Sequence, residues 1–288
     1  MAVIARTAGK RAGGPPAANS LPLAHPLNAL PKATQPAVAL RGVFKAFDGA
    51  VAVADLSLTV RPGEVVAIVG RTGAGKSTVL RLLMGTTAPE RGEVRVLGRD
   101  PAREFQALRG RLAVVFQTDR LLPWRTALEN AALGLEILGV PPGERLARAR
   151  EWLVRLGLAG AETRLPHQLS GGMRQRVALA RAFATDPEVL LLDEAFSHLD
   201  EVTAREIRAD FARLVRRYGK TTLMVTHSIE EAVEMADRVA VFGRPARVIR
   251  EVPVTPPFRD DPREARRLRE AILAAIERGH PGEDRAEG

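Results

Sequence analysis

The chain has 288 residues, enough for one large domain or two smaller ones, and carries a formal net charge of +9. It contains no cysteine, which excludes disulfide bonds and thiolate metal sites and fits a reducing compartment. The basic excess suits a nucleic acid, a phosphate-bearing ligand or an anionic membrane surface and does not choose among them.

The first 36 residues are rich in Ala, Gly and Pro, and their basic side chains have no acidic counterpart. We predict a disordered basic tail over residues 1–36. The alternative is a short basic arm that rests on membrane lipid. The charges are not followed by the apolar core of a signal peptide, and no apolar run reaches the roughly 20 residues that span a bilayer.

Ordered structure is predicted to begin near Ala37. Residues 38–44 and 56–60 have the alternating pattern of half-exposed strands, and residues 92–98 form another strand bounded by glycines. Arg61 to Glu64 reads as a turn. These segments predict a small antiparallel sheet beside the core.

Residues 70–78 read GRTGAGKST, the spacing of a phosphate-binding loop. An apolar strand precedes the loop at 65–69, and a helix is predicted over 76–84. Glycines let the backbone turn its N–H groups toward an anion at the positive end of that helix. Lys76 would reach the terminal phosphates and Ser77 would offer its hydroxyl to Mg²⁺. The alternative is a glycine-rich turn with a surface lysine.

Four more apolar runs, at 112–116, 189–192, 223–225 and 239–242, are separated by helical segments. They predict a parallel sheet covered on both faces, and hence an α/β fold. Three of the runs end in polar groups: Gln117, then Asp193 and Glu194, then Thr226 and His227. Open α/β sheets bind ligands at these strand ends.

Asp193 is placed where a nucleotide site holds its Mg²⁺ carboxylate, and Glu194 could accept a proton from the attacking water. Alone, an Asp-Glu pair after a strand is also a common helix start.

Between the Gln117 strand and Leu169 the pattern is helical. Thr126 and Glu129 have capping-box spacing, and a second helical stripe stops at Gly157. We predict an inserted helical subdomain over about 118–170. The sequence LSGGM at 169–173 then opens another helix, with Ser170 as its N-cap.

Gly171 and Gly172 leave that helix end open to an anion. Because one triphosphate is already held at Lys76, this end is available to another subunit's nucleotide. The alternative is an ordinary capped helix.

Ile207, Phe211, Leu214 and Val215 predict a later core helix. Leu268, Ile272, Leu273 and Ile276 share one helical face near the C-terminus, either docked on the domain or in contact with a partner.

The motifs at 70–78, 169–173 and 190–194, with Gln117, SHLD at 197–200 and His227, resemble in order and spacing the ATPase subunit of an ABC transporter. The resemblance covers roughly residues 37–245. It implies a P-loop NTPase (RecA-like) core with a small antiparallel β subdomain and an inserted α-helical subdomain. The expected ATPase domain covers 37–250, followed by an extension over 251–288 with one helix.

The resemblance implies a head-to-tail dimer with two ATP molecules sandwiched between the subunits. Glu194 would be the general base, His227 the γ-phosphate switch, and Ser170, Gly171 and Gly172 would close over the partner's γ-phosphate. Ser77, Gln117 and Asp193 would hold Mg²⁺. Phe47 lies where the family places an aromatic residue under adenine, although it could equally be a core residue. The residues expected to bind the nucleotide phosphates are Gly70, Arg71, Thr72, Gly73, Ala74, Gly75, Lys76, Ser77 and Thr78.

Three positions depart from the family's commonest pattern: Met173, His198 and Ser228. His198 puts communication between the two sites in doubt; we expect it to be an exposed loop residue. In the family, residues 121–125 (LLPWR) meet the coupling helix of the membrane subunit; the alternative for Trp124 is packing inside the helical subdomain. The LLPW and LSGGM motifs resemble those of the branch of the family that imports nitrate, sulfonates and taurine.

We therefore expect an ATP-hydrolysing importer subunit on the cytoplasmic face of the bacterial inner membrane. Its expected partners are a second copy, integral membrane permease subunits and, indirectly, a periplasmic or lipid-anchored solute-binding protein, with no nucleic acid. The rivals are a soluble ABC protein acting on nucleic acid or the ribosome, and a P-loop kinase.

Overall fold

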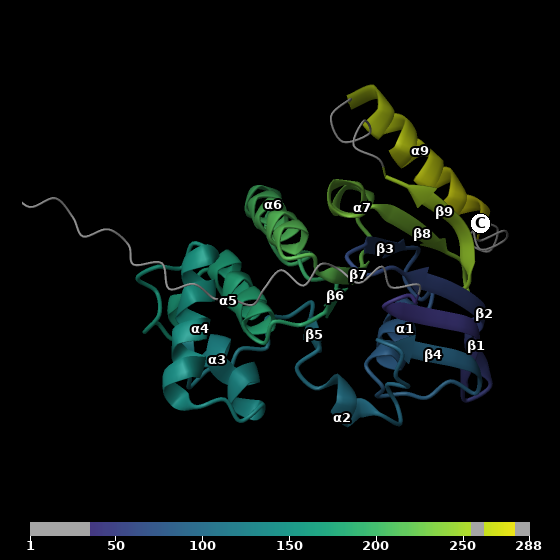
Figure 1. Ribbon diagram of the computed structural model, residues 1–288. Coiled ribbons are helices and arrows are strands. Elements are labelled where there is room, and N and C mark those ends of the chain that lie inside the picture. Colours follow the sequence, from purple (N-terminus) through teal and green to yellow (C-terminus); the bar gives the residue numbers. More distant parts are fainter. Residues whose placement is uncertain (1–34, 255–261, 280–288) are drawn as a thin grey trace, which may run out of the picture. The chain divides into compact units, whose positions relative to one another are not determined.

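The computed structural model describes residues 35–254 and 262–279; the predictions for residues 1–34 lie outside this part of the chain. Its strands form two sheets, a three-stranded sheet in the order β2-β1-β4 and a six-stranded sheet in the order β5-β6-β7-β3-β8-β9 (Figure 1). The strands are β1 (Val38–Phe47), β2 (Ala50–Val60), β3 (Val65–Val69), β4 (Arg91–Val96), β5 (Leu112–Val115), β6 (Val189–Asp193), β7 (Thr221–Val225), β8 (Arg238–Phe242) and β9 (Val248–Pro253).

The helices connect the strands. They are α1 (Lys76–Leu83), α2 (Phe105–Leu108), α3 (Ala127–Ile137), α4 (Pro142–Arg155), α5 (Gly171–Ala184), α6 (Glu201–Arg217), α7 (Ile229–Met235) and α9 (Pro262–Arg278), with a 3₁₀ turn η1 (Pro166–Gln168). Helices α1, α5, α7 and α9 contact strands of the six-stranded sheet. None of these described helices combines the length and the apolar character that crossing a bilayer requires.

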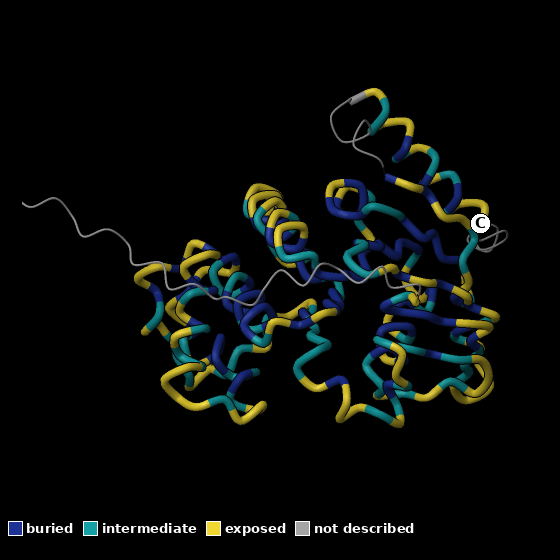
Figure 2. The backbone as a smooth tube through the Cα atoms, viewed as in Figure 1, coloured by how far each residue is buried: buried dark blue, intermediate teal, exposed yellow. Residues whose placement is uncertain are grey.

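The six-stranded sheet confirms the parallel arrangement that the apolar runs predict. Strands β5, β6, β7, β3 and β8 pair in parallel, and β3 and β7 are buried along their whole length. Figure 2 shows these central strands in dark blue. Strand β9, which pairs antiparallel with β8 at the edge of the sheet, is not predicted from the sequence.

The small antiparallel sheet is also confirmed; β1 and β2 are longer than predicted, whereas β4 ends at Val96, before the predicted end at residue 98. In β2 every second residue from Leu56 to Val60 is buried, because one face of the strand packs on the core. Helix α1 contacts β2, β4 and β6. Its apolar face, with Val79, Leu80 and Leu83 buried, therefore joins the small sheet to the large one in a single apolar cluster.

Helices α3, α4 and α5 pack on one another and form the helical layer (teal and green in Figure 1). The capping box at the start of α3 is confirmed, since the Thr126 hydroxyl accepts from the Glu129 amide and the Glu129 carboxylate accepts from the Thr126 amide. Trp152 of α4 stacks on Phe183 of α5 with ring centroids 4.8 Å apart. The helical layer thus continues through α5, past residue 170.

Helix α9 docks on α7, β8 and β9. Leu268, Ile272 and Ala275 are buried in this contact, whereas Leu273 is exposed. The prediction of a docked C-terminal helix is confirmed, and Leu273 is excluded from its buried face.

Candidate functional site

The phosphate-binding loop lies between β3 and α1, as predicted. Residues 72–78 line a cavity of about 340 Å³ together with Ala52, Arg81 and Glu194. The buried Lys76 ammonium donates hydrogen bonds to the carbonyl oxygens of Gly70 (2.7 Å) and Arg71 (3.0 Å). Burial lowers the pKa of Lys76, and the nearby carboxylates of Glu194 and Asp193 oppose that shift. A cationic group therefore stands in the loop with acidic groups facing it.

Gly75 fixes the end of α1. It caps the helix with φ 77°, in the left-handed region, and has no side chain with which to cap the first-turn N–H groups. A Cβ atom at this position would lie 2.3 Å from the Ala52 carbonyl oxygen. The uncapped N–H groups and the positive end of the helix leave a place where an anion binds favourably.

The acidic pair stands at the carboxyl end of β6. Burial, and then the neighbouring Glu194 charge, raise the pKa of Asp193. Glu194 has φ 48°, an uncommon value for a residue other than glycine, and its amide donates to the Val225 carbonyl oxygen (2.9 Å) at the end of β7. His227 follows that strand, and its Nδ1 lies 3.4 Å from Oε2 of Glu194.

Gln117 joins the same group through Ser197. Its side-chain amide donates to the Ser197 hydroxyl at 3.5 Å, and that hydroxyl donates to the Glu194 carbonyl oxygen at 2.9 Å. The polar groups that follow β5, β6 and β7 are therefore brought together beside the phosphate-loop cavity, as the strand-end pattern predicts.

Helix α5 begins with the predicted N-cap, Ser170, which lies outside the group of strand-end residues described above. The Ser170 hydroxyl accepts from the Met173 amide (3.2 Å). Gly172 is buried against α6, where a Cβ atom would lie 2.5 Å from Thr203 Cγ2, whereas Ser170 and Gly171 are exposed. Ser170 does not line the phosphate-loop cavity of its own chain.

The departures from the family pattern have simple structural outcomes. Ser228 is the N-cap of α7, because its hydroxyl accepts from the Glu231 amide (3.2 Å). His198 is exposed, as expected. Phe47 is exposed at the end of β1, outside the cavity lining, and Lys45 Nζ lies 5.2 Å from its ring centroid. Its contact with adenine stays a prediction.

Two arginines of α5 were not found by sequence reasoning. Arg174 donates to the Asp119 carboxylate (3.0 Å), and Arg181 donates to the backbone carbonyl oxygens of Asp119 (2.6 Å) and Arg120 (2.8 Å). They tie α5 to the loop that follows Gln117. No motif marks them, because their partners lie 55 or more residues away in the sequence.

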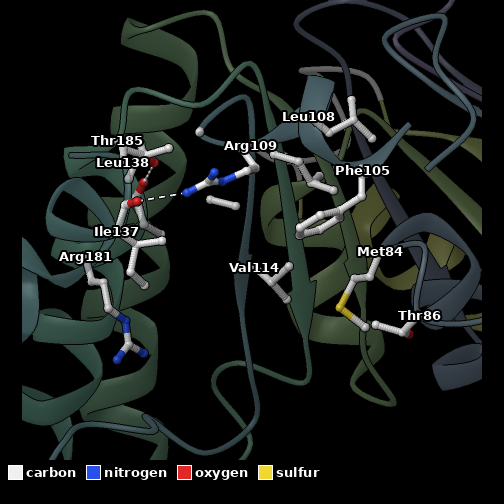
Figure 3. A pocket seen from close by; sticks show the side chains of 15 residues that line it. Met84, Thr86, Phe105, Leu108, Arg109, Val114, Ile137, Leu138, Arg181 and Thr185 are labelled. Atoms are coloured by element: carbon white, nitrogen blue, oxygen red, sulfur yellow. Dashed lines mark hydrogen bonds between the residues drawn. The ribbon is translucent and has the colours of Figure 1, made fainter. Parts of the chain in front are cut away.

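A second cavity, of about 410 Å³, opens between the small helix α2, strand β5 and helices α3 and α5 (Figure 3). We call it the apolar groove. Phe105 and Ile137 are exposed at its lining, and Arg109 donates to the Ile137 carbonyl oxygen (2.9 Å) across it. Arg181, whose pKa burial lowers, also lines it.

Trp124 is 72% exposed, so the alternative in which it packs inside the helical subdomain is wrong. It lines a separate cavity with Arg125, Glu129 and Glu136. The wholly buried Asn130 holds this turn: its amide group donates to the carbonyl oxygens of Leu122, Arg125 and Thr126, and its oxygen accepts from the Leu122 amide.

The residues predicted to hold Mg²⁺ supply oxygen donors of the type that this ion prefers. Ser77 contributes a hydroxyl, Gln117 an amide oxygen and Asp193 a carboxylate. Burial and then the neighbouring Glu194 charge raise the pKa of Asp193, and a bound cation would favour its ionised form. In residues 35–254 and 262–279, no cluster of three or more His, Asp or Glu offers a site built from protein ligands alone. The donor set therefore fits an ion that keeps several waters and binds phosphate oxygens.

A sequence profile described as ABC transporter matches residues 53–197. The chain is 42% identical to the methionine import ATP-binding protein MetN of Mesorhizobium japonicum, over 91% of this chain and 72% of that protein. It is 43% identical to the taurine import ATP-binding protein TauB of Pseudomonas aeruginosa (69% and 75% covered). It is 44% identical to the aliphatic sulfonates import ATP-binding protein SsuB of Cupriavidus necator (73% and 67% covered).

A solved structure of similar fold is a dimeric ATP-binding cassette in a post-hydrolysis state, bound to ADP and Pi. It is 32% identical, with a TM-score of 0.67, and covers 76% of this chain and 99% of its own. The expected α/β P-loop NTPase fold is thereby confirmed.

Proposed function

This chain belongs to the ABC transporter family as the ATP-hydrolysing subunit of an importer, and we propose that the solute it helps to import is nitrate, an aliphatic sulfonate or taurine. The observation that carries the catalytic part of the proposal is that Lys76 and Glu194 both line the phosphate-loop cavity and that His227 Nδ1 lies 3.4 Å from Oε2 of Glu194.

Within the site each group has a role set by its chemistry. Lys76 and the first-turn N–H groups of α1 bind and orient the terminal phosphates. Glu194 accepts the proton of the attacking water, and His227, 3.4 Å from it, senses the γ-phosphate. Mg²⁺ held through Ser77, Gln117 and Asp193 would neutralise charge on the phosphate oxygens.

We propose that two copies associate head to tail. The supporting observation is that Ser170 and Gly171 are exposed on α5 and do not line their own chain's cavity, although the helix end is suited to an anion. In the dimer these residues would close over the phosphates bound by the partner. The loop 197–200, which contacts Gln117 and Glu194 through Ser197, would then lie between the two sites.

The apolar groove and the turn of residues 121–125 support docking on permease subunits at the cytoplasmic face of the inner membrane. The groove exposes Phe105 and Ile137, and the turn exposes Trp124. Exposed apolar side chains gathered at a concave surface are typical of a protein contact. We propose that a cytoplasmic helix of the permease occupies the groove.

Replacing Glu194 by Gln tests the hydrolytic and dimeric parts together. The variant should bind ATP with near-normal affinity, hydrolyse it at least about 100-fold more slowly, and accumulate as a dimer with MgATP, because proton abstraction is lost while the phosphate contacts remain. Size-exclusion chromatography with light scattering reports the dimer. A variant that stays monomeric at saturating MgATP would contradict the head-to-tail arrangement.

Growth of a deletion strain on single sulfur or nitrogen sources tests the solute. Loss of growth on taurine, an aliphatic sulfonate or nitrate, restored by the wild-type gene, is the expected result. The match to a methionine importer spans more of the chain, so methionine is the second candidate. Loss of growth confined to methionine would overturn the proposed solute while leaving the ATPase assignment intact.

A further inference from the structure

Arg208 of α6 is the largest fully buried side chain in the described part of the chain, with 2% of its side chain exposed. Its guanidinium donates to Glu201 (2.7 Å) and to Glu234 (2.7 Å), and it lies 3.7 Å from the buried carboxylate of Glu231. One cation thus joins the first residue of α6 to two acids of α7.

Both ends of this cluster lead to the hydrolytic site. Glu201 directly follows the loop 197–200, whose Ser197 is hydrogen-bonded to Gln117 and Glu194. On the other side, Glu231 accepts from the Thr226 hydroxyl at 2.6 Å. Thr226 immediately precedes His227.

Thr226 also fixes the backbone around His227. Its hydroxyl accepts from the Ser228 amide (3.0 Å), and its own amide donates to the Ile68 carbonyl oxygen (3.1 Å) in the strand that leads into the phosphate loop. Any displacement of Glu231 is therefore transmitted to the backbone on both sides of His227.

We propose that Arg208 is a positioning residue for ATP hydrolysis. Acting through Glu201 and Glu231, it holds the loop 197–200 and the His227 loop at a fixed separation on either side of Glu194. This inference rests on the roles proposed above for Glu194 and His227.

The location of the cluster argues against a purely stabilising role. Helix α6 is already anchored by a buried apolar face that includes Ile207 and Phe211. Buried ionic clusters contribute little net stability compared with apolar packing, because desolvation offsets their attraction; what they can supply is one defined geometry. Here that geometry is the spacing of two loops beside the reacting phosphate.

The test compares variants that remove different ion pairs of the Arg208 cluster. Removing Arg208 alone would strand the buried Glu231 carboxylate and risk unfolding. The double variant R208M/E231Q therefore removes both buried charges and keeps an acceptor for Thr226. E201Q, with 77% of its side chain exposed, weakens only the link to loop 197–200 at little risk to folding. R216M is the matched control, since Arg216 also joins α6 to the end of α7, through Met235 and Asp237, at the far end of the helix.

For R208M/E231Q we expect kcat to fall about tenfold, and for E201Q about threefold, with KM for ATP and nucleotide affinity within about twofold of wild type. R208K should have a kcat between those of R208M/E231Q and wild type, because the lysine ammonium can form an ion pair with one of the carboxylates. R216M should keep wild-type kcat.

Unchanged kcat in folded R208M/E231Q, or in E201Q where the double variant does not fold, would overturn the inference. The inference would also be overturned if R208M/E231Q lost kcat and nucleotide affinity to the same degree, or if R216M lost as much kcat as R208M/E231Q. Either result would indicate general destabilisation. E194Q measured alongside separates the two levels: if E194Q hydrolyses ATP normally, the proposed site is wrong, whereas an inactive E194Q with a normal R208M/E231Q rejects the positioning role alone.

Discussion

At the residue scale, Gly75 is constrained both by its backbone angle and by its neighbours. Its φ is 77°, and a Cβ atom would lie 2.3 Å from the Ala52 carbonyl oxygen and 2.8 Å from Ala246 Cβ. Gly98 has nearly the same φ, 76°, but a Cβ atom there would meet no other atom within 4 Å. Comparing alanine substitutions at Gly75 and Gly98 therefore separates the cost of a left-handed φ from the cost of a steric clash.

We expect Gly75→Ala to reduce ATP affinity at least tenfold, because backbone must shift at the start of α1 where the phosphates bind. Gly98→Ala should lower the free energy of unfolding by about 1–2 kcal/mol from the left-handed angle alone, with ATP affinity unchanged. Titration with a fluorescent ATP analogue and thermal unfolding measure the two effects. Equal nucleotide affinity in both variants would show that the contact with Ala52 does not shape the loop.

Asp193 lies at a site where function and stability oppose each other. Burial and the Glu194 charge raise its pKa, so at neutral pH the folded state carries a carboxylate that it holds less favourably than the unfolded chain does. For an acid with a raised folded-state pKa, this penalty is fully present above the folded pKa and disappears as the pH falls toward the ordinary Asp value, about 3.9.

Asp193→Asn should therefore raise Tm at pH 7.5 by about 2–4 °C, corresponding to roughly 1 kcal/mol, while hydrolysis falls sharply. The Tm difference from wild type should shrink as the pH is lowered toward the ordinary Asp pKa, about 3.9. Differential scanning calorimetry without nucleotide measures it. A variant less stable than wild type at pH 7.5 would show that burial of the Asp193 carboxylate does not destabilise the folded state.

Sequence alone predicts those site residues whose position in the chain fixes their position in space. Lys76 sits in a motif with fixed spacing, and Glu194 and His227 follow apolar strands that meet at one edge of a sheet. Arg174 and Arg208 have no such signal, because Asp119 and Glu234, to which they donate, lie 55 and 26 residues away and become their neighbours only after packing.

At the element scale, the turn of residues 121–125 shows how a loop is held from within. From the first turn of α3, Asn130 donates to the Leu122 and Arg125 carbonyl oxygens of this turn and accepts from the Leu122 amide, and it also donates to the adjoining Thr126 carbonyl oxygen. The capping box at Thr126 predicts where α3 begins, but it does not reveal this second anchor. The edge strand β9 is not predicted for a similar reason: residues 248–253 read VIREVP, which lacks the alternation of a half-buried strand, and their pairing with β8 depends on the rest of the sheet.

Asn130→Ala should lower the free energy of unfolding by about 2–3 kcal/mol, because the Leu122 amide and several carbonyl oxygens lose buried partners. Gln175→Leu is the control: Gln175 is also buried, yet its side-chain Nε2 has no hydrogen-bond partner. An apolar side chain of similar size there should cost less than about 1 kcal/mol. Urea unfolding followed by circular dichroism ranks the two. Similar losses in both variants would mean that the hydrogen bonds of Asn130 do not hold the turn.

At the scale of the whole molecule, the apolar groove exists only because segments distant in sequence pack together. Its lining comes from α2 and β5 on one side and from α3 and α5 on the other (Figure 3). The family resemblance predicts a contact with the membrane subunit at the turn of residues 121–125, which exposes Trp124. The groove itself could not be predicted, since none of its segments carries a motif for it. Arg181 links both features, because it lines the groove and also binds the carbonyl oxygens of Asp119 and Arg120.

This geometry predicts that a charge in the groove blocks docking on the permease without affecting catalysis. Ile137 is 62% exposed in the groove lining, and Val154 is 52% exposed on α4, outside it. Ile137→Asp should reduce co-purification with the permease subunits at least tenfold, because a partner helix would have to bury the unpaired carboxylate. Val154→Asp should co-purify normally, and both variants should keep the ATPase rate of the isolated subunit. If Ile137→Asp associates with the membrane as well as Val154→Asp does, the permease docks elsewhere, and Trp124→Ala then tests whether the 121–125 turn alone holds it.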